Sequence, residues 1–503
     1  MARTIGKRRP DREPRGPDRY PRDHDSPGRT LNPDRTDPLQ AHSAGFQAGS
    51  SVAGVVRVPG SKSVAQRLLA AAAVARGRTS LEGLPGSADV VGALRCARAL
   101  GARFPGERRG DDPLAAALLR GGGAGVLEGR PPGAQEGPRP WARLEPGESG
   151  TCARLFTALA ALARPEGSGA EVVPAGTLMG RTSGPLFEAL RRAGAGVEAA
   201  APPDRWPALF TAAIPGASLE VRRPSSSQEV SALLLALAAH AGERQLRVLG
   251  PTPSRGYVDM TAGVLELFGG SVGLASLASD AEGEAGEVYT VRGPLTAPSQ
   301  TLACEGDASA AAVALAAGAL SGGRPTSVEG VGLGSLQPDV AITRCLEAFG
   351  CTSDGSDRRR LVISGAPTRG AEVDCGPFPD LAPVLAAVAA FCASRDLGAS
   401  TLTGLGTLPG KESDRIAVLA RGLEAVGLSV EQSATHLRIA PGLARVSGPV
   451  LLDPAGDHRM VFFAALLSLF EPDVRCLEPG CVRKSWPGFW RDLERAGGTL
   501  LPS

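Results

Sequence analysis

The chain has 503 residues, a formal net charge of +2, and 54 basic against 52 acidic side chains. It is 43% hydrophobic and only 4% aromatic, which is typical of a soluble globular protein and argues against a basic nucleic-acid-binding protein with aromatic stacking surfaces. No apolar run is long enough for a membrane span, and no apolar N-terminal segment indicates secretion, so we expect a cytoplasmic protein with no membrane partner. The nine cysteines show no paired spacing and no Cys/His cluster, so we expect free thiols in a reducing compartment.

Two segments are predicted to lie outside the folded core. Residues 1–45 are dense in Arg, Asp and Pro and have almost nothing to bury, which predicts a disordered tail. Residues 106–140 have Gly/Pro-rich ends, such as "RPPGAQEGPRP", which predict an insertion shaped as an elaborated hairpin or loop. Nothing in the tail indicates catalysis.

The rest of the chain contains an internal repeat whose residues vary from copy to copy while the pattern recurs. Its first part is a short apolar strand, a Gly-rich turn and a helix that ends near Gly, as in "LEGLPGSADVVGALRCARALGA" from Leu81. Further copies begin at Val172, Leu246, Ser327, Leu402 and Cys476. Its second part is a helix with a polar start and an apolar body, found in "SKSVAQRLLAAAA", "ESGTCARLFTALAAL", "SSSQEVSALLLALAA", "EGDASAAAVALAAGAL", "PFPDLAPVLAAVAAF" and "DHRMVFFAALLSLF".

The repeat predicts an α/β protein. Helices that are apolar on nearly every face pack inside a domain, whereas the other helix of each unit is expected to be partly exposed. Each unit is therefore predicted to be β-α-β-α-β-β, and six units predict two similar lobes of three units each. We expect lobe 1 to comprise residues 46–60 and 304–503, lobe 2 to comprise residues 61–303, and the active site to lie in the cleft between them.

The polar starts of the buried helices predict an anion site. If the buried helices of a lobe run parallel, their free N–H groups and positive dipole ends gather at one end. Ser and Asp at helix starts are also ordinary N-caps, worth about 1 kcal/mol each, and this simpler explanation stays open for any single start. Caps do not require the cations and the amide near these starts, however, which are Lys62, Arg67, Arg154, Gln228, Arg459 and Lys484. Their number favours a site for a strongly anionic substrate.

Nine motifs follow one another in the order known from one enzyme family: "PGSKSVAQR", "ESGTCAR", "SSSQEVSALL", "SRGYVDMT", "EGDAS", "PDLAPVLAA", "KESDR", "DHRM" and "CVRKSWPGF". Through them the chain resembles the 3-phosphoshikimate 1-carboxyvinyltransferase (EPSP synthase) family over roughly residues 50–500. The resemblance implies the two-lobed inverse α/β barrel fold of the enolpyruvyl transferases, with six βαβαββ units, three per lobe. It also implies transfer of the enolpyruvyl group of phosphoenolpyruvate to the 5-hydroxyl of shikimate 3-phosphate, with release of phosphate.

Other readings of the motifs are weaker. The related UDP-N-acetylglucosamine enolpyruvyl transferases share the six-unit fold, but their early motif and their reactive loop cysteine are not found here. "GSKS" is not a nucleotide-binding P-loop, because Ser61 separates Gly60 from Lys62. No metal and no other cofactor is implied, since His458 is the one histidine of five that lies in a motif, and it has no partner at ligand spacing. We expect His458 to be a structural hydrogen-bonding residue.

The implied substrates each carry a phosphate and a carboxylate, so they require several cations, and Arg suits such planar anions bidentately. By motif position, the resemblance implies that phosphoenolpyruvate is held by Lys62, Gly150, Arg181, Gln228, Arg415, Arg459 and Lys484. It implies that shikimate 3-phosphate is held by Lys62, Ser63, Arg67, Ser226, Ser227, Gln228, Ser254, Asp380, Thr407 and Lys411. These small molecules are the implied partners of a monomer that binds no nucleic acid.

The implied reaction requires proton transfers. The resemblance assigns Glu412 as the acid that protonates phosphoenolpyruvate and Asp380 as the base that takes the hydroxyl proton. Lys62 and Lys484 complete the catalytic set, and Lys484 is the second candidate for the proton donor. The neighbours of Glu412 in the sequence, Lys411 and Arg415, are expected to favour its ionised form, so the acid role requires burial or substrate charge to oppose them. The alternative is that Glu412 only neutralises these two cations.

Three positions depart from the family's usual pattern: Glu148 replaces a common Asn, Thr182 a common Pro, and Thr407 a common Asn on the acceptor side. Two other functions therefore stay open, an enolpyruvyl transferase with an altered acceptor and a non-catalytic binding or regulatory paralogue. Such a paralogue should have lost at least one of the four catalytic residues. All are present, namely Lys62, Asp380, Glu412 and Lys484, which favours an active enzyme.

Overall fold

The computed structural model describes residues 37–104, 123–132, 141–200, 204–277, 284–442 and 448–502. Residues 1–36 of the expected tail, and residues 106–122 and 133–140 of the expected insertion, lie outside these ranges. The predicted end of the tail at residue 45 is wrong. The strand β1 (Ser43–Ala44) pairs antiparallel with β22 (Val474–Leu477), and Phe46 is 1% exposed and packs on Trp490. Backbone pairing and one buried aromatic ring fix a segment whose composition had suggested disorder.

Six helices with apolar bodies form the interior, as predicted. They are α1 (Lys62–Val74), α4 (Gly150–Leu162), α6 (Ser227–Ala238), α8 (Ala308–Leu320), α10 (Ala382–Ser394) and α12 (His458–Ser468). Their bodies are mostly Ala and Leu, which have high helix propensity, and almost all of their residues are buried. Five of them begin with a side chain that accepts a backbone N–H of the first turn, from Ser61, Ser149, Ser226, Asp307 or Asp457. The N-cap explanation of these polar starts therefore holds.

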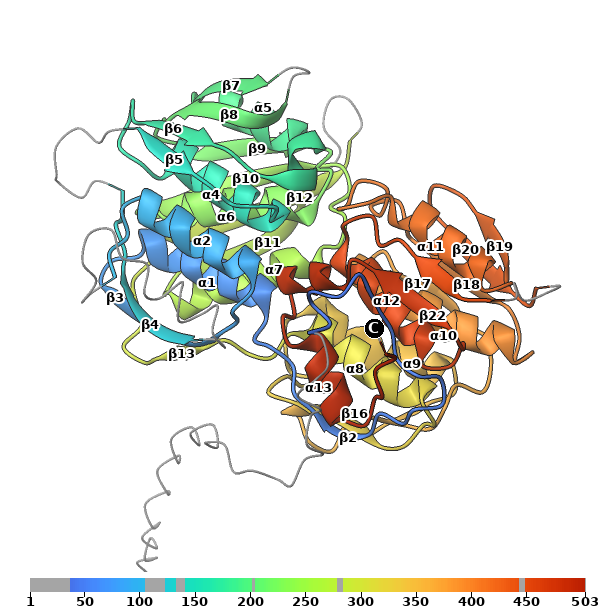
Figure 1. The fold of residues 1–503 in the computed structure, drawn as a ribbon. Helices are drawn as coiled ribbons and strands as arrows, with labels where there is room; N and C mark the ends of the chain where they lie inside the picture. Colours follow the sequence, from blue (N-terminus) through green and yellow to red (C-terminus); the bar gives the residue numbers. More distant parts are fainter. Residues whose placement is uncertain are drawn as a thin grey trace, which may run out of the picture. The chain divides into compact units, whose positions relative to one another are not determined.

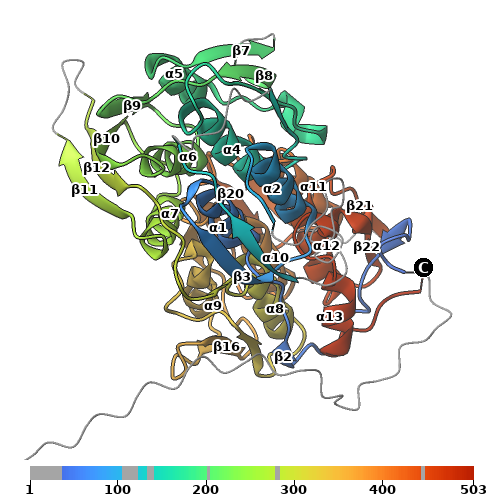
Figure 2. The ribbon, with the colours of Figure 1, turned by 90° about the vertical axis from the view of Figure 1, so that its left-hand side faces the viewer.

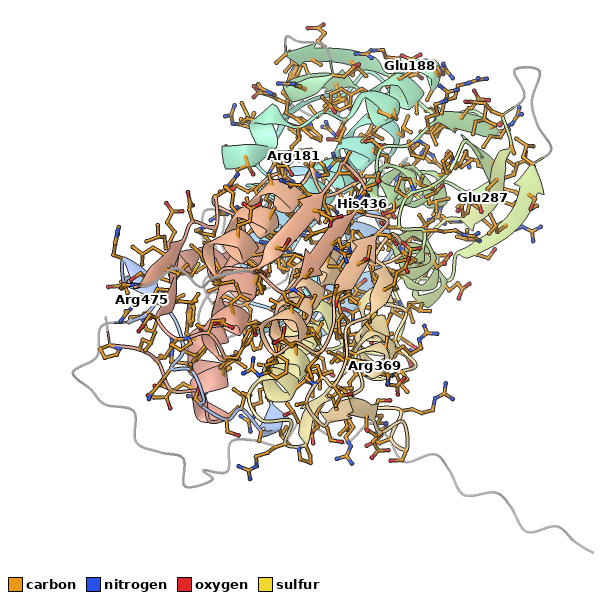
Figure 3. The ribbon with its side chains drawn as sticks, turned by 90° about the vertical axis from the view of Figure 1, so that its right-hand side faces the viewer. Arg181, Glu188, Glu287, Arg369, His436 and Arg475 are labelled. Carbon is orange, nitrogen blue, oxygen red and sulfur yellow. The ribbon has the colours of Figure 1, made fainter. Side chains whose placement is uncertain are left out.

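The second helix of each unit keeps an exposed face. These helices are α2 (Ala88–Ala99), α5 (Gly184–Arg192), α7 (Gly256–Leu267), α9 (Ile342–Ala348), α11 (Arg415–Ala425) and α13 (Phe489–Arg495). Four short 3-10 helices are η1 (Gly176–Gly180), η2 (Pro338–Ala341), η3 (Pro379–Leu381) and η4 (Pro479–Lys484). Charged side chains cover the outside, and Glu188 of α5 and Glu287 lie among them (Figure 3).

Three mixed sheets contact α1, α4 and α6. Their strand orders are β13-β3-β4, β5-β6-β8-β7 and β11-β12-β10-β9, and the last can be followed in Figure 2. One pair in each sheet is parallel and the others are antiparallel. The strands are β3 (Arg78–Leu84), β4 (Gly123–Glu128), β5 (Ala142–Leu144), β6 (Gly169–Val172), β7 (Gly196–Ala200), β8 (Arg205–Thr211), β9 (Ser218–Arg222), β10 (Gly242–Leu249), β11 (Ser271–Leu277), β12 (Gly286–Gly293) and β13 (Leu302–Ala303). The strand β4 belongs to the expected insertion and pairs with β3.

Three further mixed sheets contact α8, α10 and α12. Their strand orders are β15-β16-β14-β2, β17-β18-β20-β19 and β1-β22-β21, again with one parallel pair each. The strands not yet named are β2 (Gly54–Val56), β14 (Thr326–Glu329), β15 (Thr352–Ser353), β16 (Arg360–Ser364), β17 (Glu372–Asp374), β18 (Ser400–Thr403), β19 (Ser429–Gln432), β20 (Leu437–Ala440) and β21 (Val450–Leu452).

The buried apolar side chains form two separate clusters. One joins residues from Val64 to Cys304, and the other joins residues from Ala44 to Val56 with residues from Ala308 to Leu500. Figure 1 shows the corresponding helices and sheets as two groups, blue to yellow-green and yellow to red, with β2 in the second group. The predicted α/β fold of two lobes, built from six βαβαββ units, is confirmed, while the residue boundaries of the lobes stay a prediction.

Two smaller expectations concern the cysteines and the membrane. All nine cysteines are free thiols, as expected, and all except Cys481 are buried. Among the helices that the structure describes, none combines the length and the apolar character needed to cross a bilayer.

Candidate active site

A cavity of about 1090 Å³ is lined mostly by polar residues, which come from both parts of the chain that hold the two apolar clusters. We call residues 61–304 the N-terminal half, and residues 37–60 with 305–502 the C-terminal half. All predicted site residues except Lys484 line the cavity: Lys62, Ser63, Arg67, Gly150, Arg181, Ser226, Ser227, Gln228, Ser254, Asp380, Thr407, Lys411, Glu412, Arg415 and Arg459. Residues that are up to 397 positions apart in the chain therefore meet at one site.

Helix N-termini supply much of this lining. Lys62, Gly150, Ser227 and His458 are the first residues of α1, α4, α6 and α12, and Asp380 lies in η3 just before α10. At the starts of α1, α4, α6 and α12, the cap side chain accepts a backbone N–H, and the residues after it line the cavity. Positive dipole ends and free N–H groups at such positions favour anions.

Two buried arginines of the N-terminal half donate their hydrogen bonds to neutral groups. Arg67 donates from Nε to Thr261 Oγ1 (2.7 Å) and from Nη1 to the carbonyl of Ser63 (2.9 Å). Arg154 donates from Nη1 to Gln228 Oε1 (2.8 Å). Burial lowers the pKa of both guanidinium groups, that of Arg67 to about 10. Neutral partners hold these side chains in place without cancelling their charge.

Arg181 follows η1 and shares this property. It donates from Nη2 to Thr177 Oγ1 (3.0 Å), while its buried Nε has no hydrogen-bond partner. Burial lowers its pKa below the ordinary value. Among the described residues, Arg67, Arg154 and Arg181 form no ion pair within 4.0 Å, and the carboxylates that act on them, Glu229 on Arg154 and Glu412 on Arg181, lie farther away. The N-terminal half therefore presents three cations that no carboxylate contacts directly.

Lys62 bridges the two halves. Its Nζ lies 3.1 Å from Asp89 Oδ2 and 3.5 Å from Nε2 of His458. One turn later, Gln66 donates to Ser149 Oγ (2.8 Å) and to the carbonyl of Asp89 (3.2 Å). The first turns of α1, α2 and α4 are thereby tied together beside the Lys62 amine.

Asp380 lies among three cations of the C-terminal half. Its carboxylate accepts from Arg415 Nη1 (2.9 Å) and Arg459 Nη2 (2.6 Å), and Lys411 Nζ lies 3.9 Å away. Burial would raise the pKa of Asp380, but the charges of Arg459, Lys411 and Arg415 hold it well below its usual range. Arg415 also donates from Nε to Asp457 Oδ2 (2.8 Å). Burial would lower the pKa of Arg415, but the carboxylates of Asp457 and Asp380 raise it.

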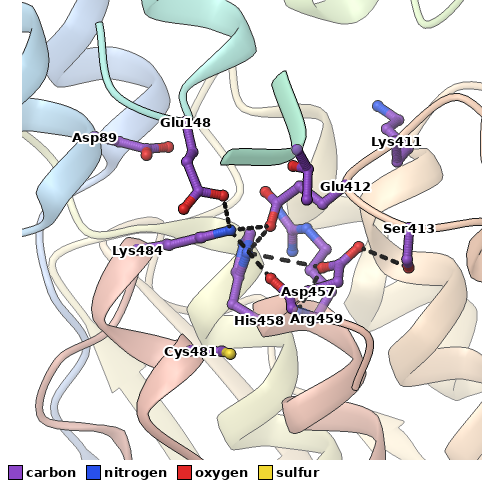
Figure 4. Close-up of polar contacts among 12 residues, drawn as sticks. Asp89, Glu148, Lys411, Glu412, Ser413, Asp457, His458, Arg459, Cys481 and Lys484 are labelled. Carbon is purple, nitrogen blue, oxygen red and sulfur yellow. Dashed lines mark hydrogen bonds and ion pairs between the residues drawn. The ribbon is translucent and has the colours of Figure 1, made fainter. Parts of the chain in front are cut away.

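Glu412 faces different cations (Figure 4). Its Oε2 accepts from Nδ1 of His458 (3.1 Å) and from Nζ of Lys484 (3.2 Å). Because the carboxylate can only accept, Nδ1 of His458 carries the proton and Nε2 faces Lys62. Lys484 also donates to Glu148 Oε2 (2.6 Å) and to the carbonyl of Gly456 (3.1 Å).

These contacts correct the expectation drawn from sequence neighbours. The side chains next to Glu412 in the chain, Lys411 and Arg415, turn toward Asp380 instead. Burial would raise the pKa of Glu412, but His458, Lys62 and Lys484 hold it well below its usual range. The carboxylate is therefore ionised in this structure, as expected, but because of other cations. The expected hydrogen-bonding role of His458 is confirmed.

The remaining predicted residues contribute hydroxyl and amide groups. Ser226 caps α6 by accepting from the N–H of Gln228 (3.3 Å), and Ser254 donates to the carbonyl of Gly376 (3.0 Å) across the two halves. Thr407 lines the cavity, and its buried Oγ1 has no hydrogen-bond partner within the protein. A Cβ on Gly150 would lie 2.9 Å from Nη1 of Arg154, so only glycine fits there without displacing a cation.

One group of side chains has the geometry of a metal site. Glu412, Asp457 and His458 place ligand atoms within 4.8 Å of one another. Asp457 is ion-paired with Arg415, Glu412 with Lys484, and Lys62 lies on the far side of the His458 ring. The surrounding positive charge opposes a bound cation, so this group fits a charge network better than a metal centre.

Several lining residues were absent from the predicted site. Arg154 was noted only as a cation, and Glu148 only as a departure from the family. Asp89 and Tyr257 also line the cavity. Tyr257 Oη donates to Asp339 Oδ1 (3.1 Å), and Ser309, which accepts from Arg459, hydrogen-bonds the other oxygen of Asp339. The "PDV" turn around Asp339 resembles an ordinary helix start, so no pattern in the sequence marks this buried carboxylate.

Comparisons with known proteins agree with one another. Residues 46–493 match the family model described as EPSP synthase (3-phosphoshikimate 1-carboxyvinyltransferase). The chain is 35% identical over 448 residues to the 3-phosphoshikimate 1-carboxyvinyltransferase of Laribacter hongkongensis, covering 88% of this chain and 96% of that protein. The 3-phosphoshikimate 1-carboxyvinyltransferase of Thiobacillus denitrificans is 34% identical over 453 residues, which cover 88% of this chain and 96% of that protein.

Solved structures share the fold at lower identity. EPSP synthase from Acinetobacter baumannii is 21% identical, with a TM-score of 0.67, covering 91% of this chain and 99% of that one. The enolpyruvyl transferase NikO from Streptomyces tendae is 18% identical, with a TM-score of 0.62, covering 91% and 98%.

Proposed function

The chain belongs to the EPSP synthase (3-phosphoshikimate 1-carboxyvinyltransferase) family, and we propose that it transfers the enolpyruvyl group of phosphoenolpyruvate to the 5-hydroxyl of shikimate 3-phosphate. The products are 5-enolpyruvylshikimate 3-phosphate and phosphate. Homologues named 3-phosphoshikimate 1-carboxyvinyltransferase match most of the chain. Within the cavity, the arrangement of charge supports the proposal best.

The cavity is lined by seven cations and five carboxylates. The cations are Lys62, Arg67, Arg154, Arg181, Lys411, Arg415 and Arg459, and the carboxylates are Asp89, Glu148, Asp380, Glu412 and Asp414. Two substrates that each bring a phosphate and a carboxylate need such an excess of positive charge, together with the helix N-termini that surround it. Arginine in particular offers paired N–H donors that match these planar anions.

We assign substrate binding to the residues that the motifs indicated. Phosphoenolpyruvate is held by Lys62, Gly150, Arg181, Gln228, Arg415, Arg459 and Lys484. Shikimate 3-phosphate is held by Lys62, Ser63, Arg67, Ser226, Ser227, Gln228, Ser254, Asp380, Thr407 and Lys411. Their common cavity supports this assignment for every residue but Lys484. Lys484 does not line the cavity, but its amine lies 3.2 Å from Glu412, which does, and this proximity supports its assignment.

The chemistry proceeds by addition and elimination. Glu412 protonates the methylene carbon of phosphoenolpyruvate while the 5-hydroxyl oxygen bonds to the central carbon and gives its proton to Asp380. The bond from that carbon to the phosphate oxygen then breaks, and the new methyl group gives a proton back to the Glu412 carboxylate, which restores the double bond. Phosphate leaves with the electron pair of the broken bond, so atoms and charge balance. Lys62 and Lys484 stabilise the negative charge of the reacting groups.

Glu412 is ionised in this structure, so it must take up a proton when the substrates bind before it can act as the acid. Glu412 and Asp380 both have lowered pKa values because cations surround them. Substrate phosphates and carboxylates that pair with the same cations withdraw this stabilisation, and closure of the site removes water. Both effects raise the two carboxyl pKa values, which allows Glu412 to hold a proton before turnover.

A phosphate-release assay tests the proposal. With phosphoenolpyruvate and shikimate 3-phosphate, the protein should release phosphate at a rate that saturates with substrate concentration. With phosphoenolpyruvate and UDP-N-acetylglucosamine, it should release none above background. Release only with the second acceptor would assign a different transferase. No release with either acceptor from folded protein would favour the binding paralogue.

A further inference from the structure

Lys484 is fully engaged in this structure. A lysine ammonium group has three N–H donors, and here its acceptors are Glu148 (2.6 Å), Glu412 (3.2 Å) and the carbonyl of Gly456 (3.1 Å). Its side chain is 15% exposed, and it does not line the cavity, whereas Glu148 does. A residue proposed to bind an anionic substrate thus has no donor left for it.

Glu148 is held in this position by its surroundings. It lies directly before Ser149, which caps α4, so its backbone is anchored at the helix start. On its other side, a Cβ on Gly176 would lie 2.5 Å from the carboxyl carbon of Glu148, and Gly176 has φ of +53°. Only glycine leaves room for the carboxylate here. The position of the Glu148 carboxylate beside Lys484 is therefore fixed by the N-terminal half of the site.

We infer that Glu148 competes with phosphoenolpyruvate for Lys484 and thereby sets the affinity for this substrate. This inference rests on the proposed function. The bridge joins the two halves, so an incoming anion must take one N–H of Lys484 from Glu148. The Glu148 carboxylate, 34% exposed, also adds a negative charge to the wall of a site that binds anions.

Removal of the Glu148 charge should not misplace Lys484. Glu412 and the Gly456 carbonyl both lie in the C-terminal half with Lys484 and continue to accept two of its donors. With Gln at position 148, the third acceptor becomes a neutral amide oxygen, which binds the Lys484 ammonium more weakly than a carboxylate does. An incoming anion can therefore take this N–H of Lys484 more readily. If Glu148 competes for Lys484, its replacement should raise the affinity for phosphoenolpyruvate. If Glu148 instead supports Lys484, its replacement should lower that affinity.

The test compares Glu148→Gln with Glu145→Gln. Glu145 lies in the same loop but is ion-paired with Arg143 on the surface (3.0 Å), so its variant controls for loss of one negative charge. At saturating shikimate 3-phosphate, Glu148→Gln should lower the KM for phosphoenolpyruvate about three- to tenfold, while Glu145→Gln leaves it unchanged. The difference should shrink at high salt, since the interaction is electrostatic.

A second pair of variants assigns the effect to Lys484. In the Lys484→Met background, Glu148→Gln should bring no further gain in affinity for phosphoenolpyruvate. A KM that is unchanged or raised in Glu148→Gln would overturn the inference, and so would a gain that persists without Lys484. Wild-type protein that releases no phosphate with shikimate 3-phosphate would instead refute the proposed function, so the two failures are distinguishable.

Discussion

The arginines in the two halves of the site have different partners. In the N-terminal half, Arg67, Arg154 and Arg181 donate to hydroxyl, amide and carbonyl groups, and burial lowers their pKa values. In the C-terminal half, Arg415 and Arg459 are paired with carboxylates that raise their pKa values against the effect of burial. Arginines that contact no carboxylate can pair directly with an anionic substrate, whereas arginines that are paired with carboxylates also control the protonation of these partners.

This difference places proton transfer in one half of the site, while cations of both halves bind the substrates. Both assigned proton-transfer groups, Asp380 and Glu412, belong to the C-terminal half, where cations hold their pKa values low. The N-terminal half contributes positive charge and capped helix starts. Substitutions in the two halves should therefore affect different kinetic constants.

The largest effect is expected in the C-terminal half. Glu412→Gln keeps the size and hydrogen bonding of the side chain but cannot donate a proton, so turnover should fall by about 10²–10⁴-fold. Calorimetric binding of shikimate 3-phosphate should change little. The matched control is Glu424→Gln on the exposed face of α11, which should keep full turnover. Near-normal turnover in folded Glu412→Gln would move the proton donor to Lys484.

The next effect belongs to the N-terminal half. Arg181→Met removes from the cavity a cation that no carboxylate contacts directly, and the KM for phosphoenolpyruvate should rise about 10–100-fold, more than turnover falls. Arg192→Met in α5 removes an arginine that is ion-paired with Glu188 and Glu220 on the surface, and it should leave both constants unchanged. A loss confined to turnover in Arg181→Met would abolish the distinction between the halves.

A smaller effect concerns the junction of the halves at Asp339. Burial first, and then the charge of Asp380, raises the pKa of Asp339 to about 6. Since this is above the unfolded value of about 3.9, the unfolded state releases this proton at lower pH, and stability should fall as pH rises from about 4 to 6. Asp339→Asn should remove about 3 kcal/mol of this pH dependence, because each pKa unit corresponds to about 1.4 kcal/mol.

Urea unfolding of wild type and Asp339→Asn at pH 4, 5, 6 and 7 checks this prediction. The difference between the two stability curves should change across that range and stay constant above it. A constant difference throughout would show that Asp339 keeps its ordinary titration, and that the network of Tyr257, Ser309 and Arg459 does not depend on its charge.

The smallest effect is expected from truncation. Removal of residues 1–36 should leave turnover and both KM values near wild type. Removal of residues 1–46 deletes β1 and the buried Phe46 ring, and β1 pairs with β22 just before the segment that bears Lys484. The longer truncation should therefore lower both stability and turnover. Equal behaviour of the two truncations would mean that β1 does not support the Lys484 segment.

Much of this architecture follows from local patterns. Polar starts before Ala/Leu-rich bodies identified the six inner helices, and the order of the motifs identified the lining of the cavity. The partners of Glu412 could not be derived in this way. It lies in a loop, where no helical or strand period dictates side-chain direction, so Lys411 and Arg415 turned away while His458 and Lys484 approached from distant segments. The raised pKa of a buried acid such as Asp339 depends on residues that are distant in the sequence, so no local pattern predicts it.

Turnover in D₂O, followed by mass and NMR analysis of the product, tests the central claim most directly. If the site protonates the methylene carbon of phosphoenolpyruvate and later removes a proton from the resulting methyl group, solvent deuterium must enter the vinyl group of the product. We predict 5-enolpyruvylshikimate 3-phosphate with deuterium in that vinyl group. Transfer without deuterium would contradict the acid–base mechanism, and pyruvate with phosphate in place of the transfer product would contradict the proposed function.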